Sequence, residues 1–190
     1  MRILLKNRAL IKISGKDSEE FLQGQFSNDI EKLDQANIQL NAYCQHQGKI
    51  IGLFWVMRIG HEFVLSFPYD LLEKIITRLK MFVIMSDVVI EDVTEFYRQI
   101  GLINESNVLE YRINTNLALI LEESTKEVGN VSSDLFFWDK ALIDSKIPQI
   151  AYKTSEKLVP QMLNLDINEI GVNFSKGCYP GQEVVARLHY

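Results

Sequence analysis

The sequence predicts an α+β fold, in which antiparallel sheets carry helices packed on one face. Residues 38–67 contain three apolar runs separated by turn signals, which is typical of a β-meander. Residues 69–82 have the apolar spacing of a helix, and two further strand-like runs follow at 87–93 and 96–103. The order strand, strand, helix, strand favours an antiparallel sheet covered by helices. The helical spacing is carried by Leu72, Ile75, Ile76, Leu79 and Phe82.

The elements before the meander are short. Residues 2–14 are expected to form one or two strands. Asp17 is expected to cap a helix that carries Phe21 and Leu22, with Glu20 completing a capping box. Residues 28–33 predict a second helical turn. The strand that begins at Lys49 is apolar on consecutive positions, so we expect it to be covered on both faces.

The second half has weaker patterns. We expect short strands at 108–113 and 117–121, and then a helix capped by Ser132 or Ser133 that ends before Pro148. Residues 152–175 are expected to be irregular, and long loops inside compact domains are often functional.

Composition limits the class of protein. The net charge of −5 argues against direct nucleic-acid binding over a broad surface. Two distant cysteines and three histidines without metal-ligand spacing predict neither a disulfide framework nor a metal site. No apolar run is long enough to span a bilayer, and the first residues lack the pattern of a secretory signal. We therefore expect a cytoplasmic protein that does not bind membranes.

The octapeptide KGCYPGQE, residues 176–183, is the strongest functional signal. Cys178 follows a lysine by two residues and precedes a helix-compatible run, with Pro180 suited to the first helical position. A helix N-terminus and a nearby lysine both favour a thiolate. A buried, inert cysteine is the alternative, and the residues alone leave both open.

With its neighbouring blocks, this octapeptide resembles the YgfZ family, which is related to the glycine-cleavage T protein. The matching blocks are KGCYPGQE with residues 185–187 behind it, 159–165 (VPQMLNL), 21–25 (FLQGQ) with Asp29, and Cys44 before 48–50 (GKI). The resemblance implies a T-protein-like fold without the C-terminal β-barrel domain of that family. It also implies one folate-binding region, with two possible intertwined subdomains at about 1–40 with 132–190 and about 41–131.

The resemblance implies a tetrahydrofolate-binding accessory protein that supports the assembly or repair of iron–sulfur enzymes, with an indirect effect on tRNA modification. Its partners would be iron–sulfur client enzymes or assembly proteins, and its functional thiol would be Cys178. A pterin needs apolar or aromatic walls and a few polar partners, and a folate tail needs a cation. The candidate binding residues are Lys176, Tyr179, Gln182, Glu183, Gln161, Arg187 and Lys49.

Whether the chain is an enzyme stays open at this point. The alternative function is a folate-dependent aminomethyl or one-carbon transferase. Such a reaction needs an acid–base or electrostatic partner near the reacting nitrogen. The stretch 50–54, where the T protein has an aspartate pair, contains no carboxylate. This favours the accessory role. A third possibility is a protein that binds a partner and no folate.

Overall fold

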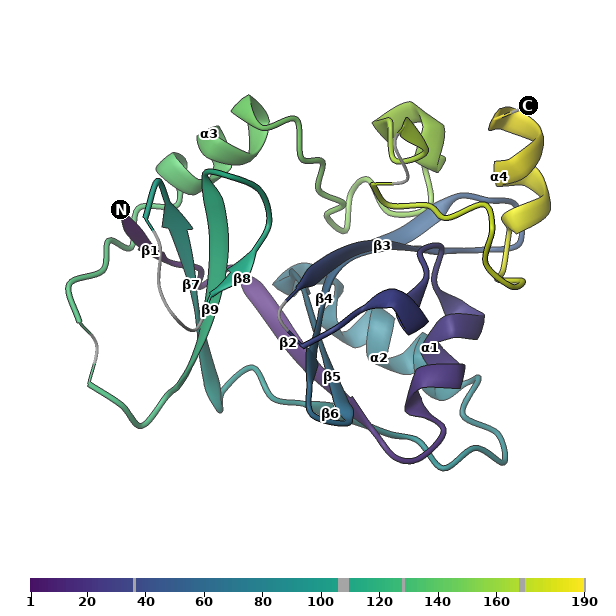
Figure 1. Cartoon of the computed structure of the whole chain (residues 1–190), viewed down its shortest axis with the longest axis horizontal. Coiled ribbons are helices and arrows are strands. Elements are labelled where there is room, and N and C mark those ends of the chain that lie inside the picture. The colour runs from purple at the N-terminus through teal and green to yellow at the C-terminus, as the bar shows by residue number, and fades with distance from the viewer. Residues whose placement is uncertain (36, 106–109, 128, 168–169, 190) are drawn as a thin grey trace.

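A computed structural model describes residues 1–35, 37–105, 110–127, 129–167 and 170–189. Two antiparallel sheets lie side by side, and the labelled termini lie at opposite ends of the molecule (Figure 1). The larger sheet has the order β3-β4-β5-β2-β6, and the smaller has the order β1-β7-β9-β8. The strands of the larger sheet are β2 (Arg8–Ser14), β3 (Ile38–Cys44), β4 (Ile50–Ile59), β5 (Glu62–Pro68) and β6 (Val89–Asp92). Those of the smaller sheet are β1 (Arg2–Leu4), β7 (Tyr97–Ile103), β8 (Tyr111–Arg112) and β9 (Leu117–Glu123).

Two helices, α1 (Ser18–Gln25) and α2 (Leu72–Lys80), belong to the same apolar core as one face of the larger sheet. Strand residues alternate between faces, so β4 directs Phe54 toward these helices and Trp55 away from them. Phe54 packs against Phe26 and Phe67, with ring centroids 5.0 and 5.1 Å apart. This aromatic cluster fixes the helices on the sheet, as the sequence predicts.

The opposite face of the larger sheet meets the smaller sheet. Leu10, Met57 and Val64 form a separate buried cluster, against which Tyr111 and Leu121 pack. Coverage on both faces explains why β4 is apolar on consecutive positions, and this prediction is confirmed.

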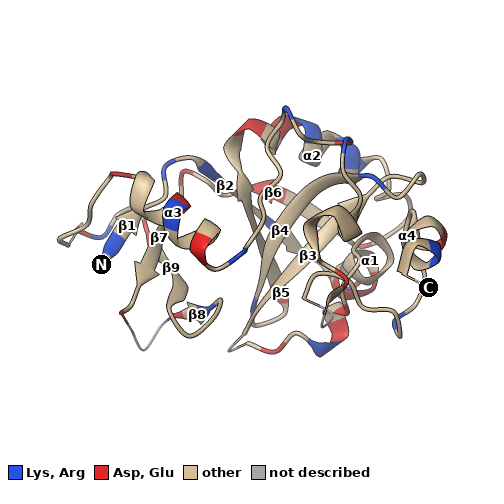
Figure 2. Cartoon of the chain, turned by 90° about the horizontal axis from the view of Figure 1, so that it is seen from above, with Lys and Arg blue, Asp and Glu red and all other residues tan. Residues whose placement is uncertain are grey.

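The helix α3 (Phe136–Asp144) lies on the smaller sheet through Trp138, whose indole lies directly over Gly101 in β7. A Cβ at Gly101 would stand 2.5 Å from the Trp138 ring, so only glycine leaves room for this contact. Acidic and basic residues occur together on α2 and on α3 (Figure 2). Such mixing fits the absence of a strong net charge.

The last quarter of the chain is largely irregular, with a short helix η3 (Pro160–Leu163) before α4 (Gln182–His189). The pairing of β4 with β5 starts at Trp55, so the first residues of β4 need another partner. Residues 155–158 supply it: Ile50 N–H donates to the Leu158 carbonyl at 2.8 Å, and Glu156 N–H donates to the Ile50 carbonyl at 2.7 Å. The irregular segment therefore completes the larger sheet.

Most element predictions are confirmed, and two details, both helix caps, are corrected. Asp17 does not cap α1, because its carboxylate accepts from Asp87 N–H. Neither Ser132 nor Ser133 caps α3. Ser132 bonds β1 through its backbone, and the Asp134 carboxylate accepts from Phe136 N–H instead. Part of the expected strand 108–113 lies outside the described residues, and the division into subdomains stays a prediction.

No described helix has the length and apolar character needed to cross a membrane. Within the ranges that the structure describes, no three His, Cys, Asp or Glu side chains form a group that could hold a metal ion.

Candidate functional site

The KGCYPGQE segment forms a tight turn before α4. Gln182 N–H donates to the Tyr179 carbonyl at 3.2 Å, and Gly181 has a φ of +84°. Proline followed by a glycine with positive φ is the signature of a type II turn. Pro180 is therefore a turn residue, and the prediction that it begins the helix is wrong: α4 begins at Gln182. Cys178 lies before the turn, and its side chain is exposed.

This turn rests on the loop between β3 and β4. A Cβ on Gly181 would stand 2.4 Å from the Gln45 carbonyl oxygen and 2.8 Å from the Gly48 Cα. Gly48 has a φ of +75° and closes the loop by donating its N–H to Gln45. Two sequence blocks more than a hundred residues apart thus meet backbone to backbone. The contact fixes where Cys178 is presented.

Lys176 anchors the other side of the turn. Its side chain is buried, and its Nζ donates at 2.5 Å to the carbonyls of both Gln23 and Phe26, at the end of α1. The amine also lies 5.3 Å from the centre of the Tyr179 ring. Burial lowers the Lys176 pKa to about 8, although Asp29 and Glu31 oppose this shift. In the structure this amine caps the carboxyl end of a helix, and its expected role in binding a folate tail stays a prediction.

The second cysteine behaves differently from the first. Cys44 is fully buried at the end of β3, and burial raises the pKa of its thiol to about 12. Tyr179 is also buried, and its pKa is raised by burial and by its proximity to Cys44. Cys44 is therefore a core residue, whereas Cys178 is the accessible thiol.

The remaining candidate residues lie around α4 and do not converge. Gln161 donates its Nε2 to the Val185 carbonyl at 2.6 Å, which ties η3 to α4. Glu183 and Arg187 form an exposed ion pair with each other. Lys49 is exposed, and Gln182 is half-buried. The proposed folate-binding roles of these residues stay predictions.

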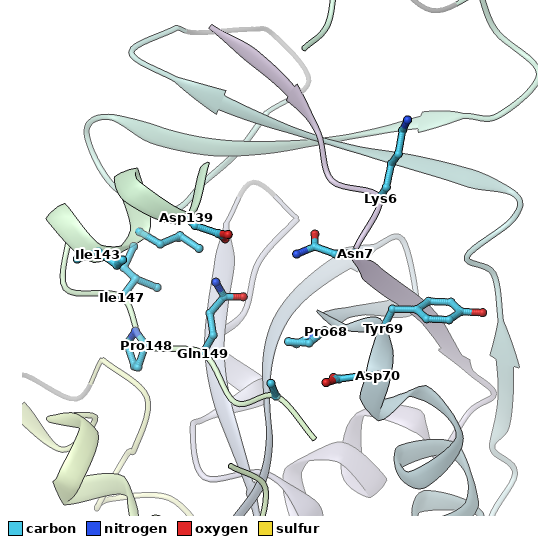
Figure 3. A pocket seen from close by; sticks show the side chains of 12 residues that line it. Lys6, Asn7, Pro68, Tyr69, Asp70, Asp139, Ile143, Ile147, Pro148 and Gln149 are labelled. Carbon is cyan, nitrogen blue, oxygen red and sulfur yellow. The ribbon is translucent and has the colours of Figure 1, made fainter. Parts of the chain in front are cut away.

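A large cavity of about 790 Å³ lies elsewhere, between α3 and the connections beside the two sheets (Figure 3). Its lining comes from several connecting segments: Asn7 follows β1, Tyr69 and Asp70 follow β5, and Gln149 follows α3. Sequence reasoning missed this cavity. In the sequence, Ile147 and Pro148 indicate only the end of a helix. In the structure they form one wall of this cavity. The same two residues also line a second cavity of about 320 Å³, next to Trp55 and Leu40.

A buried guanidinium lies behind this cavity. Arg8 donates from Nε to Ser66 Oγ at 2.8 Å, from Nη2 to the Ser66 carbonyl at 2.9 Å, and from Nη1 to Gln149 Oε1 at 3.2 Å. Burial lowers the Arg8 pKa to about 10, and Asp139 opposes this shift. Arg8 thus stays charged at neutral pH. Among the described residues, no carboxylate lies within ion-pair distance of it.

Comparison with known proteins gives several curated relatives along nearly the whole chain. An uncharacterized protein of Haemophilus influenzae is 31% identical over 194 residues, covering 99% of this chain and 68% of that protein. The tRNA-modifying protein YgfZ of Colwellia psychrerythraea is 28% identical over 220 residues, covering 99% and 67%. The protein of the same name from Blochmanniella pennsylvanica is 25% identical over 232 residues, with the same coverage.

The chain therefore spans about two thirds of the length of these relatives. A scan of family models gives no match. Among solved structures, glycine cleavage system aminomethyltransferase T from Bartonella henselae aligns with a TM-score of 0.48 at 13% identity, covering 53% of this chain and 27% of that one.

Proposed function

Because the chain belongs to the YgfZ family, we propose that it is a folate-binding accessory protein that supports the assembly or repair of iron–sulfur enzymes, and through them tRNA modification. The observation that carries the proposal is the exposed Cys178 on a turn locked by Gly48 and Gly181. An accessible thiol at a fixed position can meet a client protein or an oxidant. A buried structural cysteine such as Cys44 cannot.

The cavity of Figure 3 suits the folate part of the proposal. Its volume of about 790 Å³ lies within the range of small-molecule sites. Leu142, Ile147 and Pro148 offer apolar walls, while Asp139 and Gln149 offer polar groups for a pterin. Lys6 at the rim is a cation available to a folate carboxylate.

Calorimetric titration of tetrahydrofolate tests the folate part. The wild type and Cys178→Ala should bind equally well, because the thiol lies outside the cavity. Asp139→Asn should bind at least about 10-fold more weakly, since it loses a charged hydrogen-bond acceptor. Asp144→Asn on the same helix is the matched control, because Asp144 pairs with Lys140 away from this cavity. Absence of binding by the wild type would remove folate from the proposal.

The thiol part needs a test in cells. In a strain that lacks the chromosomal gene, a Cys178→Ser protein should fail to restore iron–sulfur enzyme activity, whereas Cys44→Ala should restore it in proportion to its folded fraction. Full restoration by Cys178→Ser would end the thiol part of the proposal. Formation of methylene-tetrahydrofolate from tetrahydrofolate and an aminomethyl donor, with release of ammonia, would instead make the chain a one-carbon transferase.

A further inference from the structure

The exposed side chain of Gln149 is oriented at the wall of the large cavity by one hydrogen bond. Its Oε1 accepts from Arg8 Nη1 at 3.2 Å. A guanidinium carries donors only, so the carboxamide must turn its oxygen toward Arg8 and its NH₂ group away from it. Figure 3 shows the nitrogen of Gln149 on the side of Asp139. Among the described residues, no group accepts from this nitrogen.

Arg8 is itself held rigidly by both sheets. Ser66 in β5 accepts from its guanidinium twice, and Ser66 Oγ donates to Gln99 Oε1 in β7 at 2.5 Å. Gln99 Nε2 then donates to the Arg8 carbonyl at 3.1 Å. With only 5% of its surface exposed, Arg8 has no freedom to swing into the cavity. A buried charge without an ion-pair partner costs free energy, so such a network needs a reason.

The cavity is therefore lined by both a donor and an acceptor. The Gln149 NH₂ group and the Asp139 carboxylate both line it, and Figure 3 shows the Gln149 nitrogen on the side of Asp139. A pterin ring presents the complementary edge: the carbonyl at position 4 accepts, while the neighbouring N3–H and the 2-amino group donate. A carboxylate can accept from both of these donors at once.

We propose that Gln149 and Asp139 form hydrogen bonds with this edge of the pterin. Arg8 is the positioning residue, because it holds the Gln149 oxygen and so turns the NH₂ group of Gln149 toward the ligand. The assignment rests on the proposed folate function and deepens it, since it names the part of the ligand that the cavity selects. It predicts preference for 4-oxo pterins over 4-amino pterins, because a 4-amino group would place a donor against the Gln149 donor.

Folic acid and its 4-amino analogue aminopterin are the probes for a calorimetric test. The wild type should bind folic acid at least about 10-fold more tightly than aminopterin, because the 4-amino group sets a donor against the Gln149 donor and the N3 of aminopterin carries no hydrogen for Asp139. Gln149→Glu should reduce this preference, because its carboxylate pairs with Arg8 and accepts from the 4-amino group. Gln47→Glu, in the exposed loop after β3, is the control for the added charge.

Arg8→Met provides a second arm, in which Gln149 is released and selectivity falls while some folic acid affinity remains. If Arg8→Met does not fold, the exposed Gln149→Glu site still decides the question. Equal wild-type affinity for the two probes, or an unchanged preference in Gln149→Glu, would overturn this inference and leave folate binding intact. Absence of binding by either probe would overturn both this inference and the folate part of the proposed function.

Discussion

Gly181 touches Gly48 through backbone atoms alone, because a Cβ on Gly181 would come within 2.8 Å of the Gly48 Cα. Each glycine also has a positive φ, at +84° and +75°. The pair therefore forms a close backbone contact, here called the joint, between the turn that carries Cys178 and the loop that follows β3.

Gly181→Ala should destabilise the protein by roughly 2–4 kcal/mol, since the new Cβ meets backbone and the φ is unfavourable for alanine. Chemical denaturation monitored by circular dichroism measures this change. Gly177→Ala in the same motif is the control, because its Cβ would meet nothing within 4 Å. Its effect should stay within about 0.5 kcal/mol, and equal losses in both variants would contradict the joint.

Lys176 should make stability depend on pH in the alkaline range. Its pKa falls from 10.5 to about 8 on folding, so the unfolded chain binds more protons between these values. Stability then rises with pH from about 8 to 10.5. From pH 8 to 9.5 this amounts to about 2 kcal/mol at most. Urea denaturation at pH 8 and pH 9.5 should show that the free energy of unfolding of the wild type rises with pH relative to that of Lys176→Met. A constant difference between the two proteins would refute the shift.

The two cysteines should react at different rates in alkylation experiments. Iodoacetamide should modify Cys178 in the native protein, because that side chain is exposed. Cys44 should resist, because it has no exposed surface and burial raises its thiol pKa to about 12. Mass spectrometry after labelling with and without guanidinium chloride gives the readout. Native labelling of Cys44 at the rate of Cys178 would disprove this separation.

Gly101→Ala should loosen α3 from the smaller sheet, because the added methyl stands 2.5 Å from the Trp138 ring. A loss of about 1–3 kcal/mol is expected from overpacking. Gly24→Ala should have the opposite sign: this glycine lies in α1 with open space around it, and alanine favours a helix by about 0.5–1 kcal/mol. Thermal denaturation compares the two variants, and destabilisation by Gly24→Ala or stability of Gly101→Ala would count against these packing arguments.

Local patterns predicted the elements because their apolar spacing is itself local. The helix α2 and the strand β4 are confirmed for this reason. Pro180 shows the limit of such patterns. Proline suits both the first position of a helix and the second position of a turn, and the signal that separates these two roles was the following Gly181.

The site depends on partners that no local pattern contains. Lys176 donates to backbone carbonyls 150 and 153 residues earlier in the chain. The motif by itself does not indicate that this amine has hydrogen-bond partners within the protein. The large cavity gathers its wall from four separate segments, and Gln149 acquires its orientation from Arg8 across 141 residues. Such relationships follow from the packing of the sheets, which sequence periodicity does not specify.

The pairing of residues 155–158 with the start of β4 has a consequence for synthesis on the ribosome. Until these residues emerge, both backbone groups of Ile50 that bond this segment face solvent beside an apolar strand. An open edge of this kind pairs readily with strands of other chains. A nascent chain that stalls before residue 155 thus keeps this edge open to such pairing, and residues 155–158 cover it once they are in place.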